Sequence, residues 1–445
     1  MIDRTLTEEL KRWAEKADHK PLILRGARQT GKTTLVREFG KAFDNFIYLD
    51  LEKQENRKIF DSNLTFSDLL ASIFYHSGTQ RSNNKVLIFI DEIQNSPAAV
   101  ASLRYFYEEA HDIHVIAAGS LLESLIDKSI SFPVGRVEYL YLRPCSFKEF
   151  LNATGEDKYL RFEGIREIPI YAHDKLTELF NRYTLTGGMP EAVQKYAETR
   201  DMMVVNNVFR NLITAYSDDV EKYGRNSSMV QHIRHILNSG FFSAGQRIRF
   251  ERFGSSGYRS REMGEAFRAL EKALLLELVY PLTKPVMPAV PDVRKSPKLI
   301  WLDTGMVNFM AGIQKDIFNT KDITGAWRGI VAEHIAGQEL LTIDNGISTK
   351  RYFWVREAKN SNAEIDYVFL RNGLLYPVEI KSAKGSRLLS IHLYMDGAPH
   401  NVAVRIRTSP FSVDNITTQK GKKFRLINLP FYMIHKLPEV LDSVS

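Results

Sequence analysis

The first constraint on this chain is a run near its N-terminus that reads Gly26, Ala27, Arg28, Gln29, Thr30, Gly31, Lys32, Thr33 and Thr34. Its first eight residues fit the phosphate-binding pattern G-x-x-x-x-G-K-[ST]. Residues 21–24 before it are typical of a short buried strand, and residues 35–39 after it have helical apolar spacing. A glycine-rich loop between strand and helix lets backbone N–H groups surround an anion at the helix N-terminus. The sequence therefore predicts an α/β domain with a nucleotide site in this loop.

Two side chains of the loop have specific expected roles. We expect Lys32 to reach the outer phosphates of ATP and the Thr33 hydroxyl to hold Mg²⁺. The alternative is a chance glycine-rich turn, which the matching strand and helix on its two sides disfavour.

A second signal is the apolar run 86–90, which ends in Asp91 and Glu92. Such a run suits a strand buried on both faces of a parallel sheet, and ligands of α/β sheets bind at the carboxyl ends of the strands. Asp91 is expected to take Mg²⁺ through its water shell, and Glu92 to orient and polarise the attacking water. Many buried strands end in an acid, but here the pair follows Thr33 by 58 residues in a strand–helix alternation.

Two further residues carry open alternatives. Ser120 ends the predicted strand 113–119, where it could contact a γ-phosphate or the lytic water, or cap a following helix. Arg136 could act as an arginine finger, within its own chain or from a neighbouring subunit. A plain surface arginine is an equally good interpretation of Arg136.

Composition excludes some classes of protein. The formal net charge of +7 permits a polyanionic partner without requiring one. Cys145 is the only cysteine, which excludes a disulfide framework and a cysteine metal cluster and fits a reducing, cytoplasmic setting. No segment approaches the roughly 18 consecutive apolar residues of a membrane helix, so no membrane association is expected.

The middle of the chain reads mainly as helices from 202 to 276, followed by strand-like runs at 279–282 and 298–302. Helices followed by a short ribbon predict a winged helix-turn-helix. Five arginines lie between residues 245 and 261, interleaved with the aromatic residues Phe250, Phe253 and Tyr258. This composition suits nucleic-acid binding by phosphate contacts and base stacking, and a solvated loop or a protein-contact surface explains it equally well.

The last third predicts strands at 352–355, 363–370 and 375–382, with a hairpin turn at Arg371-Asn372-Gly373. Alternation places Ile365, Tyr367 and Phe369 on one face of the second strand and Glu364 and Asp366 on the other. On the third strand Glu379 and Lys381 share a face.

If these strands pair in antiparallel fashion, Asp366, Glu379 and Lys381 converge on one face. That is the arrangement of a metal-dependent phosphodiesterase, in which two carboxylates hold Mg²⁺ and the lysine orients water or stabilises charge. Glu333, from a helix that begins near residue 327, could add a carboxylate. The alternative is an amphipathic strand pair with a salt-bridged polar face. Eight Lys or Arg against two Asp between residues 387 and 436 predict either a phosphate-attracting surface or a solvated one.

The motifs together resemble those of the prokaryotic AAA+-type ATPases, and within them a group that pairs the ATPase with a C-terminal domain of uncharacterised function. The residues that carry the resemblance are 25–33, 89–94, 118–120, 133–136, 142–144 and 147–151. The resemblance implies an interior strand before the phosphate loop and a small helical lid that contains Gly187-Gly188-Met189-Pro190. It also implies a nucleotide and Mg²⁺ role for Lys32 and Thr33, a sensor role for Ser120 and a candidate finger role for Arg136.

The C-terminal segment resembles the PD-(D/E)XK, restriction-endonuclease-like fold. Asp366 matches the motif aspartate and Glu379-Ile380-Lys381 matches the E-x-K element, whereas Ala363-Glu364-Ile365 replaces the proline that often precedes the aspartate.

We therefore expect an α/β ATPase core at 1–155, a helical lid at 156–222, a winged-helix-like domain at 223–322 and a nuclease-like domain at 323–445. The predicted function is ATP hydrolysis coupled to binding or Mg²⁺-dependent cleavage of DNA or RNA, with a homo-oligomer as a candidate assembly. One alternative is a regulatory ATPase whose C-terminal domain is an inactive docking or DNA-binding module. Another is a transcription regulator that acts through the winged helix alone.

Overall fold

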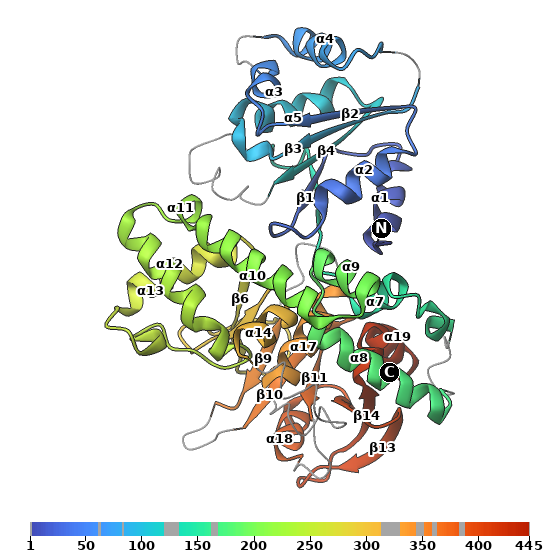
Figure 1. The fold of residues 1–445 in the computed structure, drawn as a ribbon. Coiled ribbons are helices and arrows are strands. Elements are labelled where there is room, and N and C mark those ends of the chain that lie inside the picture. The colour runs from blue at the N-terminus through green and yellow to red at the C-terminus, as the bar shows by residue number, and fades with distance from the viewer. Residues whose placement is uncertain are drawn as a thin grey trace.

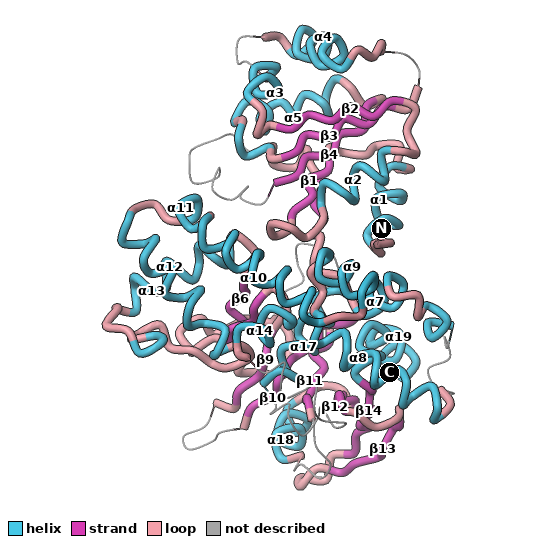
Figure 2. The backbone as a smooth tube through the Cα atoms, viewed as in Figure 1, coloured by secondary structure: helices cyan, strands magenta, loops and turns pink. Residues whose placement is uncertain are grey.

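The computed structural model describes residues 2–60, 64–81, 84–119, 133–161, 168–312, 330–343, 351–357, 363–381 and 388–444. Figure 1 shows an upper lobe built from the N-terminal residues and a larger lower body that contains the rest of the chain. The strands of the two parts form separate sheets (Figure 2). Among the helices described, none is long and apolar enough to cross a membrane.

The upper lobe contains a five-stranded parallel sheet in the order β2-β3-β4-β1-β5. Its strands are β1 (Leu22–Arg25), β2 (Asn45–Asp50), β3 (Val86–Asp91), β4 (Ile113–Gly119) and β5 (Glu138–Tyr141). The strand before the phosphate loop is interior, as predicted, and β4 separates it from the strand that carries Asp91. A parallel sheet aligns the carboxyl ends of its strands, so the two motifs meet at one edge.

Helices cover both faces of this sheet. One face packs on α1 and α2, and the other on α4 and α5. The predicted N-terminal amphipathic helix is confirmed, because Leu6, Leu10 and Trp13 are its buried residues. The helices of this lobe are α1 (Leu6–Ala14), α2 (Lys32–Gly40), α3 (Gln54–Ile59), α4 (Phe66–Ser77) and α5 (Pro97–Glu109).

After β5 the chain enters the lower body, where one continuous apolar core extends from Phe147 to Val444. The helices predicted as an ATPase lid belong to this core, and α8 contacts α14 and the turn at 431–436 near the C-terminus. The helices of this part are α7 (Phe147–Ala153), α8 (Ile170–Thr186), α9 (Pro190–Thr199), α10 (Met202–Asp218), α11 (Val220–Tyr223), α12 (Ser227–Ser239), α13 (Ser260–Lys272) and α14 (Thr304–Met310).

The predicted ribbon after α13 is β6 (Leu276–Val279) paired in antiparallel fashion with β8 (Lys298–Trp301). Arg247 adds a single bridge to Lys298. Between the two strands, β7 (Pro281–Leu282) leaves the ribbon and pairs with β9 of the C-terminal sheet. The ribbon is thereby tied to the last third of the chain.

The C-terminal sheet has seven strands in the order β13-β14-β12-β11-β10-β9-β7. Its outer strand β13 is largely exposed and was not predicted. The elements are α17 (Ile330–Thr342), β9 (Tyr352–Val355), β10 (Glu364–Arg371), β11 (Leu374–Ile380), α18 (Leu389–Gly397), β12 (Val402–Arg407), β13 (Ser412–Thr417), β14 (Lys423–Pro430) and α19 (Leu437–Val444).

The predicted antiparallel pairing of β10 with β11 is confirmed, with Tyr367 opposite Val378. Tyr367 and Phe369 pack in the same cluster, as predicted. The prediction is wrong for Ile365, because the pairing of β10 with β9 shifts by one residue between Ile365 and Val368. Such a bulge changes the face on which side chains emerge. Ile365 and Val368 consequently pack in the cluster that contains α18, while Tyr367 packs in the one that contains α17.

The close packing at the junction between the lobes can be tested by a substitution at Gly188. A Cβ on Gly188, just before α9, would collide with the Cys145 carbonyl oxygen, whose neighbouring N–H donates to the Gly188 carbonyl at 2.6 Å. We expect Gly188→Ala to destabilise the fold by about 1–3 kcal/mol through overpacking, measured by calorimetric or denaturant unfolding. Gly257→Ala is the control, because nothing lies within 4 Å of its Cβ position. Equal effects of the two substitutions would contradict this account.

Candidate functional site

The phosphate loop joins β1 to α2 in a conformation that its glycines permit. Gly31 has a φ of 92°, in the region that glycine tolerates best, and a side chain on Gly26 would meet the Leu142 carbonyl oxygen at 2.6 Å. Lys32 is buried, and its Nζ donates to the carbonyl oxygens of Gly26 and Ala27 at 2.9 Å each. Burial lowers the pKa of Lys32 to about 8. A triphosphate in the loop would supply the negative charge that this buried ammonium lacks.

The two predicted magnesium residues lie side by side. The Thr33 hydroxyl donates to Asp91 Oδ2 at 2.7 Å, and the Tyr48 hydroxyl donates to the same oxygen at 3.3 Å. Burial raises the pKa of Asp91. A hydroxyl and a carboxylate beside a phosphate loop are the oxygen ligands that Mg²⁺ prefers, so these residues fit the ion. Glu92 follows Asp91 with a left-handed φ of 51°, and its carboxylate accepts a hydrogen bond from the Gln94 amide.

A pocket of about 870 Å³ lies in front of the loop. Lys32, Thr33, Thr34 and Glu92 line it, together with residues 28, 29 and 31 of the loop. Its other walls come from the N-terminal segment at 2–11 and from the start of α9 at 190–194. Neither wall was assigned to the nucleotide site from the sequence, although the Gly-Gly-Met-Pro turn marks the start of the second. The pocket is in the size range of ligand sites.

The loop also contacts the end of α10. Arg28 forms an ion pair with Asp219, and the Tyr216 hydroxyl donates to the Arg28 carbonyl oxygen at 3.1 Å. Lys222 Nζ contacts Asp219 at 2.9 Å and also lines the nucleotide pocket. A nucleotide in the pocket would therefore lie against side chains of both lobes.

Two further residues, Ser120 and Arg136, were predicted for this site. Ser120 lies outside the described residues. Arg136 pairs with Glu108 of α5 at 3.2 Å and is not among the residues that line the nucleotide pocket. A role for Arg136 in a neighbouring subunit remains a prediction.

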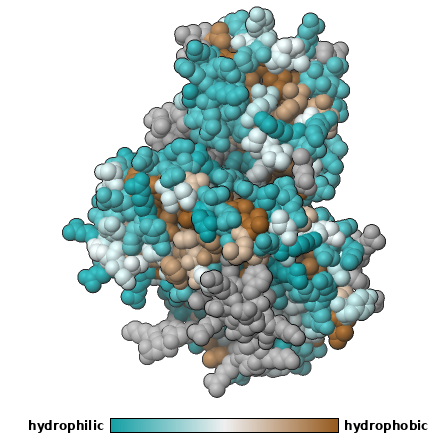
Figure 3. Space-filling model, viewed as in Figure 1, coloured by the Kyte–Doolittle hydropathy of each residue, from teal (hydrophilic) through white to brown (hydrophobic). Residues whose placement is uncertain are grey.

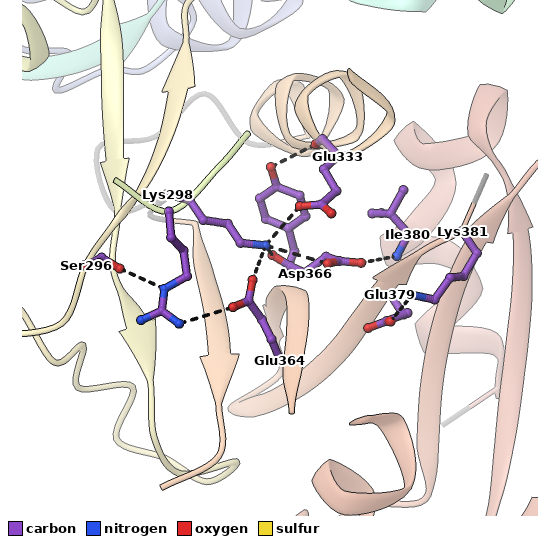
Figure 4. Close-up of polar contacts among 10 residues, drawn as sticks. Ser296, Lys298, Glu333, Glu364, Asp366, Glu379, Ile380 and Lys381 are labelled. Carbon is purple, nitrogen blue, oxygen red and sulfur yellow. Dashed lines mark hydrogen bonds and ion pairs between the residues drawn. The ribbon is translucent and has the colours of Figure 1, made fainter. Parts of the chain in front are cut away.

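In the C-terminal domain, Glu333, Glu364 and Asp366 surround Lys298, a lysine that the sequence did not single out (Figure 4). Lys298 Nζ lies 3.1 Å from Glu333 Oε2, 2.8 Å from Glu364 Oε1 and 3.7 Å from Asp366 Oδ1. The Lys298 side chain is only 3% exposed. Burial alone would lower its pKa, but Glu333, Asp366 and Glu364 outweigh burial and hold the pKa above its ordinary value.

The E-x-K element lies beside this cluster. Asp366 Oδ2 accepts a hydrogen bond from the Ile380 N–H at 2.7 Å, and Lys381 Nζ contacts Glu379 Oε1 at 2.5 Å. The other Glu379 oxygen is buried with no hydrogen-bond partner among the described residues. Burial, reinforced by Asp366, raises the pKa of Glu379 to about 8 and that of Glu333 to about 7.

The predicted metal site at these residues remains a prediction. Glu333, Asp366, Glu379 and Lys381 do converge, but within the described parts of the chain no three acidic, histidine or cysteine side chains are placed to hold a metal ion. The Lys298 ammonium contacts Glu333, Glu364 and Asp366, whereas Glu379 pairs with Lys381. Lys298 was missed because it belongs to β8, 35 residues before Glu333 and 68 before Asp366. In the sequence, its one distinguishing feature was its place as the charged first residue of the predicted apolar strand 298–302.

In the arginine-rich stretch between residues 245 and 261, the arginines and the aromatic residues face different surroundings. Its arginines are exposed, and Arg247 contacts Glu364 at 3.6 Å. Its aromatic rings turn inward: Phe250 and Phe253 pack on Phe267 of α13, and Tyr258 packs on His232 of α12. The predicted stacking of bases on these rings is therefore not supported, whereas phosphate binding by the arginines remains a prediction.

Three regions of the chain match known protein families. Residues 18–151 match the AAA domain, residues 177–317 match a domain of unknown function (DUF8612), and residues 328–419 match another domain of unknown function (DUF4143). An uncharacterized protein of Haemophilus influenzae is 23% identical over 201 residues, which cover 43% of this chain and 44% of that protein. The alignment thus spans less than half of that relative.

Solved structures also show similarity. The Walker-type ATPase of Pyrococcus abyssi is 14% identical with a TM-score of 0.45, covering 70% of this chain and 96% of that one. The Aeropyrum pernix ORC1 protein, solved in complex with DNA, is 12% identical with a TM-score of 0.31, covering 70% and 93%. Because these scores are low, the assignment rests on the AAA match, the parallel sheet and the loop geometry. Together they identify residues 18–151 as a P-loop ATPase domain of the AAA type.

The lowered pKa of Lys32 makes nucleotide binding depend on pH. Phosphates would raise this pKa, so above pH 8 binding requires proton uptake and the affinity falls as pH rises. We expect ATP binding at pH 9 to take up close to one proton at Lys32, measured by calorimetry in buffers of different ionisation enthalpy. At pH 7 Lys32 is protonated in both states and contributes no uptake. The same proton balance at pH 7 and pH 9 would contradict the assignment.

Lys298→Met tests the buried cation. Removing one partner of a buried ionic cluster costs about 3–5 kcal/mol, and we expect a loss of that size at pH 8.5. Carboxyl groups with raised folded-state pKa values bind protons as the pH falls, which relieves their repulsion, so the loss should shrink at pH 5.5. Denaturant unfolding at both pH values measures it. The exposed Lys284→Met is the control, and a pH-independent loss would argue against carboxylate repulsion.

Proposed function

We propose that this chain is an ATP-hydrolysing switch whose lower body binds nucleic acid. The observation that carries the ATPase part is the hydrogen bond between Thr33 and Asp91 at the edge where the phosphate loop and the β3 carboxylates meet. Thr33 and Asp91 would hold Mg²⁺, which when bound neutralises phosphate charge in the transition state.

Each residue has a defined task in this proposal. Lys32 exchanges the carbonyl oxygens of Gly26 and Ala27 for phosphate oxygens when ATP binds. Glu92 lines the same pocket and orients the attacking water for in-line displacement of the γ-phosphate. Asp91 is expected to act through the metal and Glu92 on the water, so their substitutions should have different effects.

The nucleic-acid part rests on exposed positive charge. The arginines between residues 245 and 261 are exposed to solvent. Arg247 and Arg261 pair with Glu364 and Glu265, and these exposed ion pairs can exchange for phosphate contacts. A further pocket of about 310 Å³ beside β11 is lined by Lys381, Arg407 and His173. Hydrophilic side chains cover most of the face shown in Figure 3. When basic side chains neutralise phosphates, counterions are released, so the affinity for nucleic acid falls steeply as the salt concentration rises.

The order α17-β9-β10-β11-α18-β12, with β11 and β12 parallel, supports a restriction-endonuclease-like domain. Lys298 favours a binding role over cleavage, because its ammonium pairs with Glu333 and Asp366, two of the carboxylates of the predicted metal site. Magnesium-dependent cleavage is the second candidate, and the unpartnered buried oxygen of Glu379 favours it. A docking module for a protein partner is the remaining alternative.

The first experiment measures ATP binding and hydrolysis. Lys32→Ala should lose both. Glu92→Gln should keep binding and slow hydrolysis by about 10²-fold or more, since it removes a group that acts in the transition state. Glu55→Gln, an exposed acid on α3, is the control. Unchanged hydrolysis in Glu92→Gln would contradict the role of Glu92.

DNA and RNA binding is measured in parallel by fluorescence anisotropy across salt concentrations. Replacing Arg249 and Arg252 by Gln should weaken binding and reduce the salt slope by about one for each phosphate that the protein no longer neutralises. Arg182→Gln is the matched control. Salt-independent binding, or none, would support the docking alternative. Cleavage with Mg²⁺ or Mn²⁺ that disappears in Asp366→Ala and Lys381→Ala would establish the nuclease.

A further inference from the structure

A second pocket lies where the two lobes meet, away from both sites described above. Its volume is about 510 Å³, and it is enclosed by α13, β6, β8, α17, the start of β9 and the chain just after β5. In Figure 1 these elements belong to the middle of the chain, and the lining residues lie between Tyr141 and Tyr352. Tyr141, Leu276, Trp301, Leu341 and Tyr352 give the pocket an apolar and aromatic lining. Its volume suits a small organic molecule.

The charges in this lining are predominantly positive. Arg143, Arg268, Lys272 and Arg351 line the pocket against two acids, Glu271 and Glu277. Glu277 is already engaged, because its Oε2 accepts from Arg351 Nε at 3.1 Å and from Arg351 Nη2 at 2.5 Å. No ion pair between Arg143 and either acid is observed among the described residues.

Arg143 is poorly satisfied by the protein. Its Nε is buried and has no hydrogen-bond partner within the described ranges. Its guanidinium lies 5.0 Å from the centre of the Tyr141 ring. Burial lowers the pKa of Arg143, although Glu277 opposes that effect. A buried donor without a partner costs free energy that an incoming acceptor would recover.

We propose that this pocket binds a small organic oxyanion that carries an aromatic ring. Arg143 and the exposed Arg268 recognise the carboxylate or phosphate, since the guanidinium fork matches both groups. The aromatic and aliphatic lining takes the ring. This binding does not depend on the proposed function.

Three hydrogen bonds also connect the pocket to the phosphate loop. The Arg143 carbonyl oxygen accepts from Arg4 Nη2 at 2.6 Å, and Arg4 Nη1 donates to the Thr30 carbonyl oxygen at 3.0 Å. The Tyr141 hydroxyl accepts from Arg25 Nη1 at 3.0 Å, one residue before Gly26. An occupant that moves Arg143 or Tyr141 therefore shifts groups that hold the loop. Occupation of the pocket changes ATP affinity, and ATP changes the affinity of the pocket by the same factor.

Phenyl phosphate and benzoate are suitable probes, titrated by calorimetry into the full chain carrying Lys32→Ala, so that the phosphate loop does not contribute. We expect saturable binding of at least one probe. Adding Arg143→Gln should weaken it about tenfold, as for a lost charged hydrogen bond, and Arg268→Gln should weaken it less. Adding Arg210→Gln, on the surface of α10, should leave it unchanged. No binding of either probe, or binding indifferent to both Arg143→Gln and Arg268→Gln, would overturn the proposal.

The coupling is tested separately with the native chain. ATP affinity is measured with and without saturating probe, and we expect a change of about fivefold or more, within the usual range of coupling between sites. Arg143→Gln should abolish the change. Probe binding with an unaltered ATP affinity would refute the coupling. Absence of ATP binding would refute the proposed function, and the calorimetric titration of the pocket would still stand by itself.

Discussion

The buried guanidinium of Arg4 joins the parts of this molecule on which the nucleotide site depends. It donates to the Thr30 carbonyl of the phosphate loop and to the Arg143 carbonyl after β5, and it lies 3.2 Å from Glu149. Glu149 in turn accepts from the Thr5 N–H at 2.7 Å and from the Ser146 N–H at 3.0 Å, at the start of α7. The N-terminal segment, the loop and the entry to the lower body are thus fixed to one another. Moving any one of them disturbs the wall of the nucleotide pocket.

Lys298 fixes elements of the C-terminal domain to one another through ion pairs, as Arg4 fixes elements at the junction of the lobes. Its ammonium compensates carboxylates on α17 and β10 while its backbone belongs to the ribbon β6–β8. Burying that many ionised groups is costly unless they are paired. The arrangement therefore couples the position of the ribbon to the ionisation of Glu333 and Asp366. Two carboxylates that the sequence predicted as part of a metal site, Glu333 and Asp366, therefore lie beside the ammonium of Lys298.

Much of the ATPase lobe could be predicted because its signals are local. The phosphate loop, the run before Asp91 and the strand before Ser120 each lie within a few residues of the feature that defines them. Parallel pairing then brings their ends to one edge of a sheet, so the contact between Thr33 and Asp91 follows from the order of elements. The hairpin at Arg371-Asn372-Gly373 was predictable for the same reason, and Asn372 and Gly373 have the positive φ values that such a turn requires.

By itself the sequence determined the phosphate loop, the meeting of Thr33 with Asp91 and the antiparallel pairing of the strands that carry Asp366 and Glu379. Tertiary structure alone decided that Asp366 and Glu333 meet Lys298, because this lysine arrives from a separate strand. Tertiary structure also decided that the aromatic rings near residue 250 pack inward. It placed a bulge in β10 that changes the face on which Ile365 lies. It brought the N-terminal segment and α9 together as walls of the pocket at the phosphate loop. The physical reason is the same in each case. These features depend on packing between segments far apart in the chain, and a local pattern of residues contains no information about its distant neighbours.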